Sequence, residues 1–316
     1  MKALVYTAGN GVTLSDVPRP APGTDVLVDV LRAGICGTDI GAVQRGAPPL
    51  RSPVVVGHEV VGTRTDSGQL VTVNPLLSCG SCTACARGDD HLCETRTVLG
   101  VHRDGAFAER VAVPAANIVP LPADADIGRA VLAEPLATAL HAWRRAGTLP
   151  GATVAVIGTG AIGLCVLTLA SLHQAAQVDV CDVDELKLRH AVRVGSGLVS
   201  AAASLPGTYD VVFDTVGSAQ TRADAAAALR PGGAAVLIGL HEDAFTLSGS
   251  RLVGGERSIV GSFGYRHTDF QEAVRHIGLV DPGWASVFPL SAGAGLLNGT
   301  SRPPHGTAKV QLALDS

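Results

Sequence analysis

The stretch VAVIGTGAIGL, residues 154–164, contains the pattern that decides the fold. An apolar run ends in three glycines spaced G-x-G-x-x-G, at Gly158, Gly160 and Gly163, before a second apolar run. In a strand–turn–helix unit these glycines permit a tight turn, a close approach to a pyrophosphate, and close packing of the helix on the strand. The next strand-like run ends at Asp182, about 20 residues on, where a carboxylate would accept hydrogen bonds from ribose hydroxyls. The stretch predicts a dinucleotide site, and a carboxylate there favours NAD over NADP because it would repel a 2′-phosphate.

Strand and helix patterns alternate from residue 152 to about residue 276. Such alternation predicts a parallel sheet with crossover helices, the doubly wound Rossmann architecture, which we place at residues 146–279. Ile162, inside the glycine pattern, is expected to line the cofactor site with the three glycines. Two alternatives stay open here: a glycine-rich turn that binds no nucleotide, and a methyltransferase-like use of the same architecture.

The first 145 residues have a different pattern. Short apolar runs rich in Val are interrupted by Gly and Pro, which is typical of a mostly β unit. The stretch DIGRAVLAEPLATALHAWRRAG, residues 126–147, predicts a helix that ends near Gly147. The apolar run AKVQLAL, residues 308–314, predicts a last strand that rejoins this first unit. The whole chain is therefore expected to be an α/β protein.

Composition excludes several classes of function. The net charge is −4, with 28 acidic and 24 basic residues, and no basic run suits a nucleic acid. Residues 146–178 carry no Asp, Glu, Lys or Arg, but their glycines favour a buried strand, turn and helix over a membrane span. The first 20 residues lack the pattern of a signal peptide, so we expect a cytoplasmic protein.

Four of the seven cysteines lie close together, in the spacing C-x2-C-x2-C-x7-C. An odd cysteine count without a secretion signal argues against a disulfide framework. Four thiolates can close a tetrahedral shell around Zn²⁺, which leaves no position for a substrate, so this zinc would be structural. An iron–sulfur site and a nucleic-acid zinc ribbon fit less well: no Pro follows the last cysteine, and the loop has acidic residues beside its arginine. The predicted ligands are Cys79, Cys82, Cys85 and Cys93.

Three further motifs contain residues suited to a second metal. AGICGTDIG contains Cys36, VVGHEVVG contains His58 and Glu59, and AEPLATALHAW contains Glu134. Each residue alone is more often a packed core residue than a ligand, and their combination is what points to a site.

With these motifs in this order, the sequence resembles the zinc-dependent medium-chain alcohol and polyol dehydrogenases over nearly the whole chain. The resemblance rests on GICGTD, GHE, the four-cysteine segment, DGAFAERVAVPAANIVPLP, EPLATALHA and GTGAIGL. It implies a mostly β, GroES-like catalytic domain, formed by residues 1–145 and completed by residues 280–316, with a Rossmann NAD-binding domain at residues 146–279. It also implies two zinc ions per chain and a homodimer or homotetramer.

The resemblance also implies roles for individual residues. Cys36 and His58 would ligate a catalytic zinc, and Glu59 and Glu134 would complete or flank its shell. A zinc with an open position acidifies a bound alcohol or polarises a carbonyl. Thr38 would hydrogen-bond the substrate oxygen and pass on its proton. The resemblance also gives positions to two residues outside the shell: Asp39 would orient His58, and Lys309 would lie near the cofactor pyrophosphate.

One departure from the family pattern bears on the substrate. Many relatives have a His three residues after the Thr of GTD, whereas this chain has Gly41. Several sugar and polyol-phosphate dehydrogenases also lack that His. We therefore expect hydride transfer between NAD(H) and a secondary alcohol or ketone of a polyol, sugar or cyclitol. The alternatives are a zinc-independent, NADPH-dependent alkene or imine reductase of the same fold, and a non-catalytic nucleotide-binding scaffold.

Overall fold

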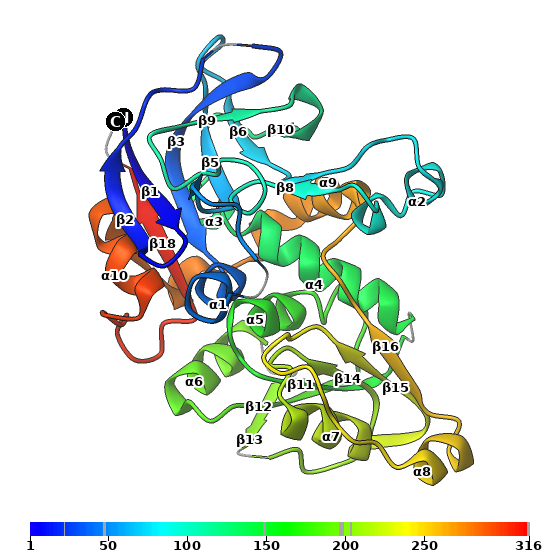
Figure 1. The fold of residues 1–316 in the computed structure, drawn as a ribbon. Coiled ribbons are helices and arrows are strands. Elements are labelled where there is room, and N and C mark those ends of the chain that lie inside the picture. Colours follow the sequence, from blue (N-terminus) through cyan, green and yellow to red (C-terminus); the bar gives the residue numbers. More distant parts are fainter. Residues whose placement is uncertain (22, 47–48, 148–149, 196–198, 203, 315–316) are drawn as a thin grey trace. The chain divides into compact units, whose positions relative to one another are not determined.

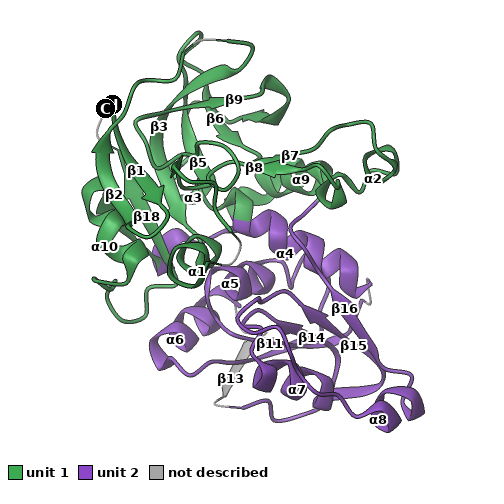
Figure 2. Cartoon of the chain, viewed as in Figure 1, with its two compact units in different colours: residues 1–134, 266–278, 285–316 green, residues 135–265, 279–284 purple. Residues whose placement is uncertain are grey.

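The chain divides into two compact units, shown in different colours in Figure 2. The computed structural model describes residues 1–316 apart from 22, 47–48, 148–149, 196–198, 203 and 315–316. Unit 1 comprises Met1–Glu134, Arg266–Gly278 and Ala285–Ser316, and unit 2 comprises Pro135–Tyr265 and Leu279–Trp284. The functional domain boundaries expected at 145/146 and 279/280 remain a prediction.

Unit 2 is built on a parallel sheet that has six strands in the described part of the chain, in the order β13-β12-β11-β14-β15-β16. Numbered along the chain, this is the order 3-2-1-4-5-6 of a Rossmann sheet, as the sequence predicted. The central strands β11 and β14 are nearly continuous runs of buried residues, TVAVI and YDVVFD, because helices cover a parallel sheet. The strands are β11 (Thr153–Ile157), β12 (Gln177–Cys181), β13 (Val199–Ala202), β14 (Tyr209–Asp214), β15 (Leu229–Leu237) and β16 (Ser258–Gly261).

The helices between these strands follow the predicted alternation. Helix α5 packs on β11, and α7 packs on β14 and β15. Asp184 and Ser218 begin α6 and α7 as N-caps, each accepting hydrogen bonds from backbone N–H groups of its helix's first turn. These helices are α5 (Ala161–Thr168), α6 (Glu185–Val194), α7 (Ala219–Ala227) and α8 (Gly249–Gly254), and α4 (Ala133–Ala146) precedes the first strand.

The single helix expected over residues 126–147 is two helices, α3 (Ile127–Ala130) and α4. Pro135 explains the second start: proline has no N–H to donate, and it is tolerated in the first turn, where that N–H needs no partner within the helix. The first turn of α4 therefore includes Glu134 and Pro135, and Glu134 is the last residue of the first segment of unit 1.

Unit 1 is mostly β, as expected. Its largest sheet has the strand order β10-β6-β5-β3-β18-β17, with β9 also pairing with β3. A three-stranded sheet has the order β2-β1-β4, and β7 pairs with β8 near the cysteine segment. The strands are β1 (Lys2–Thr7), β2 (Gly11–Asp16), β3 (Val26–Ile35), β4 (Val54–Val55), β5 (Glu59–Arg64), β6 (Leu70–Val73), β7 (Leu76–Leu77), β8 (Thr97–Val98), β9 (Arg110–Val113), β10 (Ile118–Pro120), β17 (Ala285–Pro289) and β18 (Lys309–Ala313).

The end of the chain returns to unit 1. Strand β18, red in Figure 1, lies between β3 and β17, antiparallel to β3 and parallel to β17. The predicted last strand is therefore confirmed. Unit 1 also contains α1 (Gly37–Arg45), α2 (Thr83–Ala86), α9 (His267–His276) and α10 (Gly293–Asn298). Its core is dominated by Val, Leu and Ile from the two larger sheets, together with Phe107.

No helix in the described part of the chain is both long enough and apolar enough to cross a membrane.

Candidate active site and metal centres

Cys36 lies at the junction of a strand and a helix in unit 1. Strand β3 ends at Ile35, and Cys36 is the N-cap of α1, with its Sγ 3.5 Å from the backbone nitrogen of Thr38. The Cys36 N–H donates to Asp39 Oδ2 at 2.9 Å, which completes a capping box. The N-terminus of α1, the positive end of its dipole, therefore faces the Cys36 side chain.

The next two predicted residues, His58 and Glu59, lie at the start of β5 and close to Cys36. His58 directly precedes this strand, and Glu59 is its first residue. Ligand atoms of Cys36, His58 and Glu59 lie within 4.8 Å of one another. Gly57, directly before His58, has φ +98°, and a Cβ there would lie 2.6 Å from Cγ of the Phe107 ring. Glycine therefore suits the backbone position that leads into His58.

Asp39 holds His58 as well as Cys36. Asp39 Oδ1 lies 3.1 Å from His58 Nδ1, and both side chains are buried. Burial opposes charge on the imidazole, but Asp39 and Cys36 outweigh it and raise the pKa of His58 well above its usual value. With Nδ1 facing Asp39, Nε2 is the nitrogen left to bind a metal, the arrangement that metal-ligating histidines normally have.

Glu59 has a second charged neighbour, Lys309. The Lys309 ammonium on β18 forms an ion pair with Glu59 Oε1, and the two side chains are 4% and 0% exposed. Burial opposes the charged form of Lys309, yet Glu59 and Cys36 raise its pKa above the usual value. Gly34, on the strand between them, leaves the space, because a Cβ there would overlap the Glu59 carboxylate and lie 3.1 Å from Lys309 Cε. The structure therefore places Lys309 beside the candidate metal ligands; its predicted contact with pyrophosphate remains a prediction.

The triplet fits a zinc ion. Among the described residues, Glu59 Oε2 is a buried carboxylate oxygen with no hydrogen-bond partner. A buried carboxylate oxygen without a partner is costly, and a cation beside the thiolate and the imidazole would satisfy it. One thiolate, one imidazole and one carboxylate are donors that Zn²⁺ accepts in proteins.

Two predicted catalytic residues lie at the edge of the triplet. Glu134 is half-buried at the start of α4 and acts electrostatically on Lys309, but it is not among the three residues whose ligand atoms come together. Thr38 is exposed in the first turn of α1, two residues after Cys36. Their predicted roles, in the zinc shell and on the substrate oxygen, remain predictions.

The four clustered cysteines also come together, in unit 1. Their sulfurs lie within 4.8 Å of one another; Cys79 and Cys85 are 3.9 Å apart, and Cys82 and Cys85 are 3.5 Å apart. A tetrahedron of thiolates about 2.3 Å from zinc has sulfur–sulfur edges of about 3.8 Å, so the observed spacing fits the metal. Hydrogen bonds from the N–H groups of Ser81 and Cys82 lower the pKa of Cys79 to about 5, which favours the thiolate that zinc needs. We call residues 79–93 the cysteine lobe.

The glycine turn of unit 2 has the geometry that its sequence predicted. Gly158 has φ +92°, and a Cβ there would lie 2.6 Å from Val216 Cγ2. A Cβ on Gly163 would overlap the Gly158 carbonyl, whereas one on Gly160 would have no described atom within 4 Å. Helix α5 can therefore pack against the turn while space stays open beside its N-terminus, where Ile162 is half-buried.

Asp182 has a second task that its sequence position did not reveal. Its Oδ2 accepts hydrogen bonds from the Thr159 N–H at 2.6 Å and the Thr159 hydroxyl at 2.9 Å. Oδ1 accepts from the Asp184 N–H at 2.9 Å. The carboxylate expected to bind ribose therefore also fixes the middle of the glycine turn.

Sequence reasoning missed Asp214 at the end of β14. This buried carboxylate accepts hydrogen bonds at 3.0 Å from the N–H groups of both Val216 and Gly217, and so shapes the loop that faces Gly158. Burial raises the pKa of Asp214, while the backbone donors partly oppose that rise. An acidic residue at the end of an apolar strand, followed by TVG, was the available signal.

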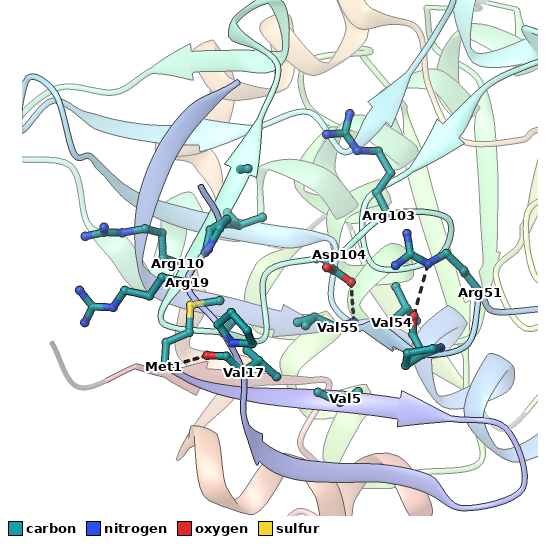
Figure 3. A pocket seen from close by; sticks show the side chains of 17 residues that line it. Met1, Val5, Val17, Arg19, Arg51, Val54, Val55, Arg103, Asp104 and Arg110 are labelled. Carbon is teal, nitrogen blue, oxygen red and sulfur yellow. Dashed lines mark hydrogen bonds between the residues drawn. The ribbon is translucent and has the colours of Figure 1, made fainter. Parts of the chain in front are cut away.

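A separate pocket of about 590 Å³ opens on unit 1, and none of the predicted site residues lines it (Figure 3). Two of its arginines are already matched by carboxylates. Arg103 Nη2 lies 2.5 Å from Asp25 Oδ2, and Arg110 Nε lies 2.6 Å from Asp29 Oδ1. The pocket therefore lies apart from both candidate metal centres.

The fold and the two thiol-containing centres define a zinc-type dehydrogenase with a Rossmann unit. Comparison with known proteins agrees: residues 22–123 match the model of the alcohol dehydrogenase GroES-like domain, and residues 161–278 match that of the zinc-binding dehydrogenases. The chain belongs to the zinc-binding alcohol dehydrogenase family, and is thus an oxidoreductase of the dehydrogenase class.

Three relatives illustrate the similarity. L-threonine 3-dehydrogenase of Streptomyces coelicolor is 36% identical over 292 residues, 84% of each chain. L-galactonate-5-dehydrogenase of Escherichia coli K12 is 34% identical over 281 residues, 81% of each chain. Among solved structures, a zinc-binding dehydrogenase from Sinorhizobium meliloti 1021 bound to NADP is 29% identical, with a TM-score of 0.91, covering 99% of this chain and 98% of that one.

Proposed function

We propose that this protein is a zinc-dependent, NAD-linked dehydrogenase that oxidises a secondary alcohol of a polyol, sugar or cyclitol, or reduces the corresponding ketone. The observation that carries the proposal is the triplet of Cys36, His58 and Glu59, whose ligand atoms lie within 4.8 Å of one another. The buried Glu59 oxygen without a partner among the described residues supports a cation at this position.

Each residue of the site has a distinct part in this proposal. A bound zinc would supply a Lewis acid that acidifies an alcohol or polarises a carbonyl. Asp39 keeps the His58 ring in one tautomer by facing Nδ1, and its other oxygen fixes the Cys36 backbone. The Thr38 hydroxyl, exposed two residues after Cys36, accepts the substrate's proton at Oγ1 and passes its own to solvent. Lys309 balances the Glu59 charge, and Glu134 flanks the site.

The substrate class is supported by two observations. Two relatives are named as dehydrogenases of L-threonine at position 3 and of L-galactonate at position 5. The chain has Gly41 where many family members have a His, and several sugar and polyol-phosphate dehydrogenases of the family also lack that His. A secondary hydroxyl within a polar chain or ring therefore suits the site.

The preference for NAD is part of the proposal. Asp182 presents a carboxylate at the end of β12, next to the glycine turn, where the 2′-phosphate of NADP would meet a negative charge. The similar dehydrogenase from Sinorhizobium meliloti was solved with NADP, so the preference for NAD over NADP needs its own test. We also propose two zinc ions per chain, one on the triplet and one on the cysteine lobe, and a homodimer or homotetramer.

The test combines metal analysis with turnover. Purified protein is assayed for NADH formation with a panel of polyols, sugars, their phosphates and cyclitols, before and after dialysis against a strong chelator. Activity should disappear with the zinc and return when zinc is restored. Cys36→Ser should lose turnover, whereas the control Cys165→Ala, at a buried thiol of α5, should keep it. Full turnover by metal-free protein or by Cys36→Ser would refute the proposal.

A further inference from the structure

The cysteine lobe contacts α9, a helix that lies 177 residues further along the chain. Asp89 and Asp90 lie between the third and fourth cysteines of the lobe, and α9 begins at His267. All of these residues belong to unit 1. The lobe therefore has a partner outside itself, which the proposed structural zinc alone does not explain.

The contact is made by two adjacent carboxylates and the start of the helix. Arg266 Nε and Nη2 donate to Asp89 Oδ1 at 3.1 and 2.7 Å. The backbone N–H of His267 donates to Asp90, with its Oδ1 and Oδ2 at 3.2 and 3.1 Å. A negative charge at the first turn of a ten-residue helix is favourable because it complements the helix dipole. The Arg266 side chain also lowers the pKa of the Asp89 carboxyl.

A third contact comes from the body of unit 1. The side-chain amide nitrogen of Asn74 lies 3.1 Å from His267 Nδ1. Asn74 Oδ1 accepts the Leu76 N–H at 3.0 Å, so the amide is oriented with its nitrogen toward the imidazole. Asn74 follows β6 and is buried. The start of α9 is thus held both by the lobe and by Asn74, which follows β6 of the largest sheet. We call Asp89, Asp90, Arg266 and His267 the helix clamp.

The clamp lies where the chain leaves unit 2. Arg266 directly follows Tyr265, the last residue of the long segment of unit 2. The four residues 262–265 link Arg266 to the end of β16, at the carboxyl edge of the parallel sheet. In open parallel sheets of this order, ligands bind outside the carboxyl ends of the strands. The clamp therefore anchors one end of a short link whose other end is at the coenzyme edge.

From these contacts we propose that Asp89 and Asp90 are positioning residues through which zinc in the cysteine lobe strengthens coenzyme binding. The lobe keeps its shape when the four thiolates share a metal, and the two carboxylates then fix the start of α9 and the link over residues 262–265. Without the metal the carboxylates lose their fixed position, and the link at the coenzyme edge loosens. This inference rests on the proposed function, since it requires that the chain bind NADH.

The experiment measures the coupling between two ligands rather than turnover. The affinity for NADH is determined by fluorescence titration of protein with and without zinc in the cysteine lobe. The affinity of the lobe for zinc is determined by chelator competition with and without saturating NADH. The Cys85→Ala variant shows which part of the zinc released to the chelator comes from the cysteine lobe. Thermodynamic linkage requires the same coupling factor in both directions. We expect about threefold to fivefold, the size typical of partly exposed charged contacts.

The clamp variants decide the outcome. Asp90→Ala and Arg266→Ala should retain both ligands but reduce the coupling factor toward one, and Arg266→Lys should restore part of it. The matched control is Arg87→Ala. Arg87 also pairs with Asp89, with its Nε 3.9 Å from Asp89 Oδ2, but it belongs to the lobe itself. Its loss should therefore leave the coupling factor unchanged. Coupling near one in wild-type protein, or unchanged coupling in both clamp variants, would overturn the inference. Wild-type protein that binds neither NADH nor NADPH would instead refute the proposed function.

Discussion

Replacing Lys309 by Met should destabilise the metal-free protein strongly. Lys309 and Glu59 are 4% and 0% exposed, so the substitution leaves the Glu59 carboxylate buried without its cation. Removing one partner of a buried ion pair costs about 3–5 kcal/mol, which agrees with the Coulomb energy of about 4 kcal/mol for unit charges about 4 Å apart at an effective dielectric constant of about 20. The loss should appear as a lower urea midpoint with an unchanged slope.

The effect of Lys309→Met should depend on whether zinc is bound. If Glu59 faces the metal, zinc supplies a second positive charge, and the cost of Lys309→Met should be clearly smaller in zinc-loaded protein than after chelation. Lys309→Arg keeps the charge and serves as the control, and the double variant Lys309→Met/Glu59→Gln should recover part of the loss because it removes both charges. A cost below about 1 kcal/mol in metal-free protein, the range of exposed pairs, would show that the pair is not buried as described. If Lys309→Met costs the same free energy of unfolding with and without zinc, Glu59 does not face the metal.

Four further predictions concern other parts of the chain. Gly34→Ala should lower the zinc content of the triplet while sparing the lobe, because its methyl group would overlap the Glu59 carboxylate; elemental analysis with normal zinc at both centres would contradict this. Cys85→Ala should reduce zinc from about two ions to about one per chain, since three thiolates no longer close the tetrahedron, and a value that stays near two would argue against a metal in the lobe. Asp182→Ser should reduce the ratio of kcat/KM for NAD over NADP by about tenfold or more, because it removes the charge that repels the 2′-phosphate; an unchanged ratio would exclude Asp182 as the selective residue. Burial and the Asp179 carboxylate, 2.7 Å away, raise the pKa of Tyr209, so the folded chain keeps a proton that the unfolded chain loses above about pH 10. Folding stability should therefore fall as the pH rises past that value, and the fall should be shallower in Tyr209→Phe; identical slopes in urea titrations at pH 9 to about 11 would disprove the assignment.

The parts of this protein that local sequence encodes were predictable. The glycine turn at Gly158, Gly160 and Gly163, and the cysteine lobe, depend on spacings of a few residues, and the structure brings these residues together as expected. Cys36 and His58 were identified by motif and resemblance, because their closeness depends on how β3 and β5 pair.

Contacts that depend on strand register were beyond sequence reasoning. Gly34 lies opposite Glu59 on β5 and opposite Gln311 on β18, and this register brings Lys309 to Glu59 although 250 residues separate them. Nothing local to Lys309 indicates a carboxylate partner. The break between α3 and α4 is different: Pro135 was a visible signal, and an apolar pattern running through it hid the second helix start.

The position of β18 has a consequence for how the chain is made. Residues 32–35 of β3, which lead directly into Cys36, pair with β18, which follows all of unit 2 along the chain. Because synthesis runs from the N-terminus, this edge of β3 has no strand to pair with while unit 2 is being translated. Unpaired edges invite pairing with other chains. The nascent protein therefore keeps this strand edge exposed to other chains until β18, which carries Lys309, closes the sheet beside the proposed metal ligands.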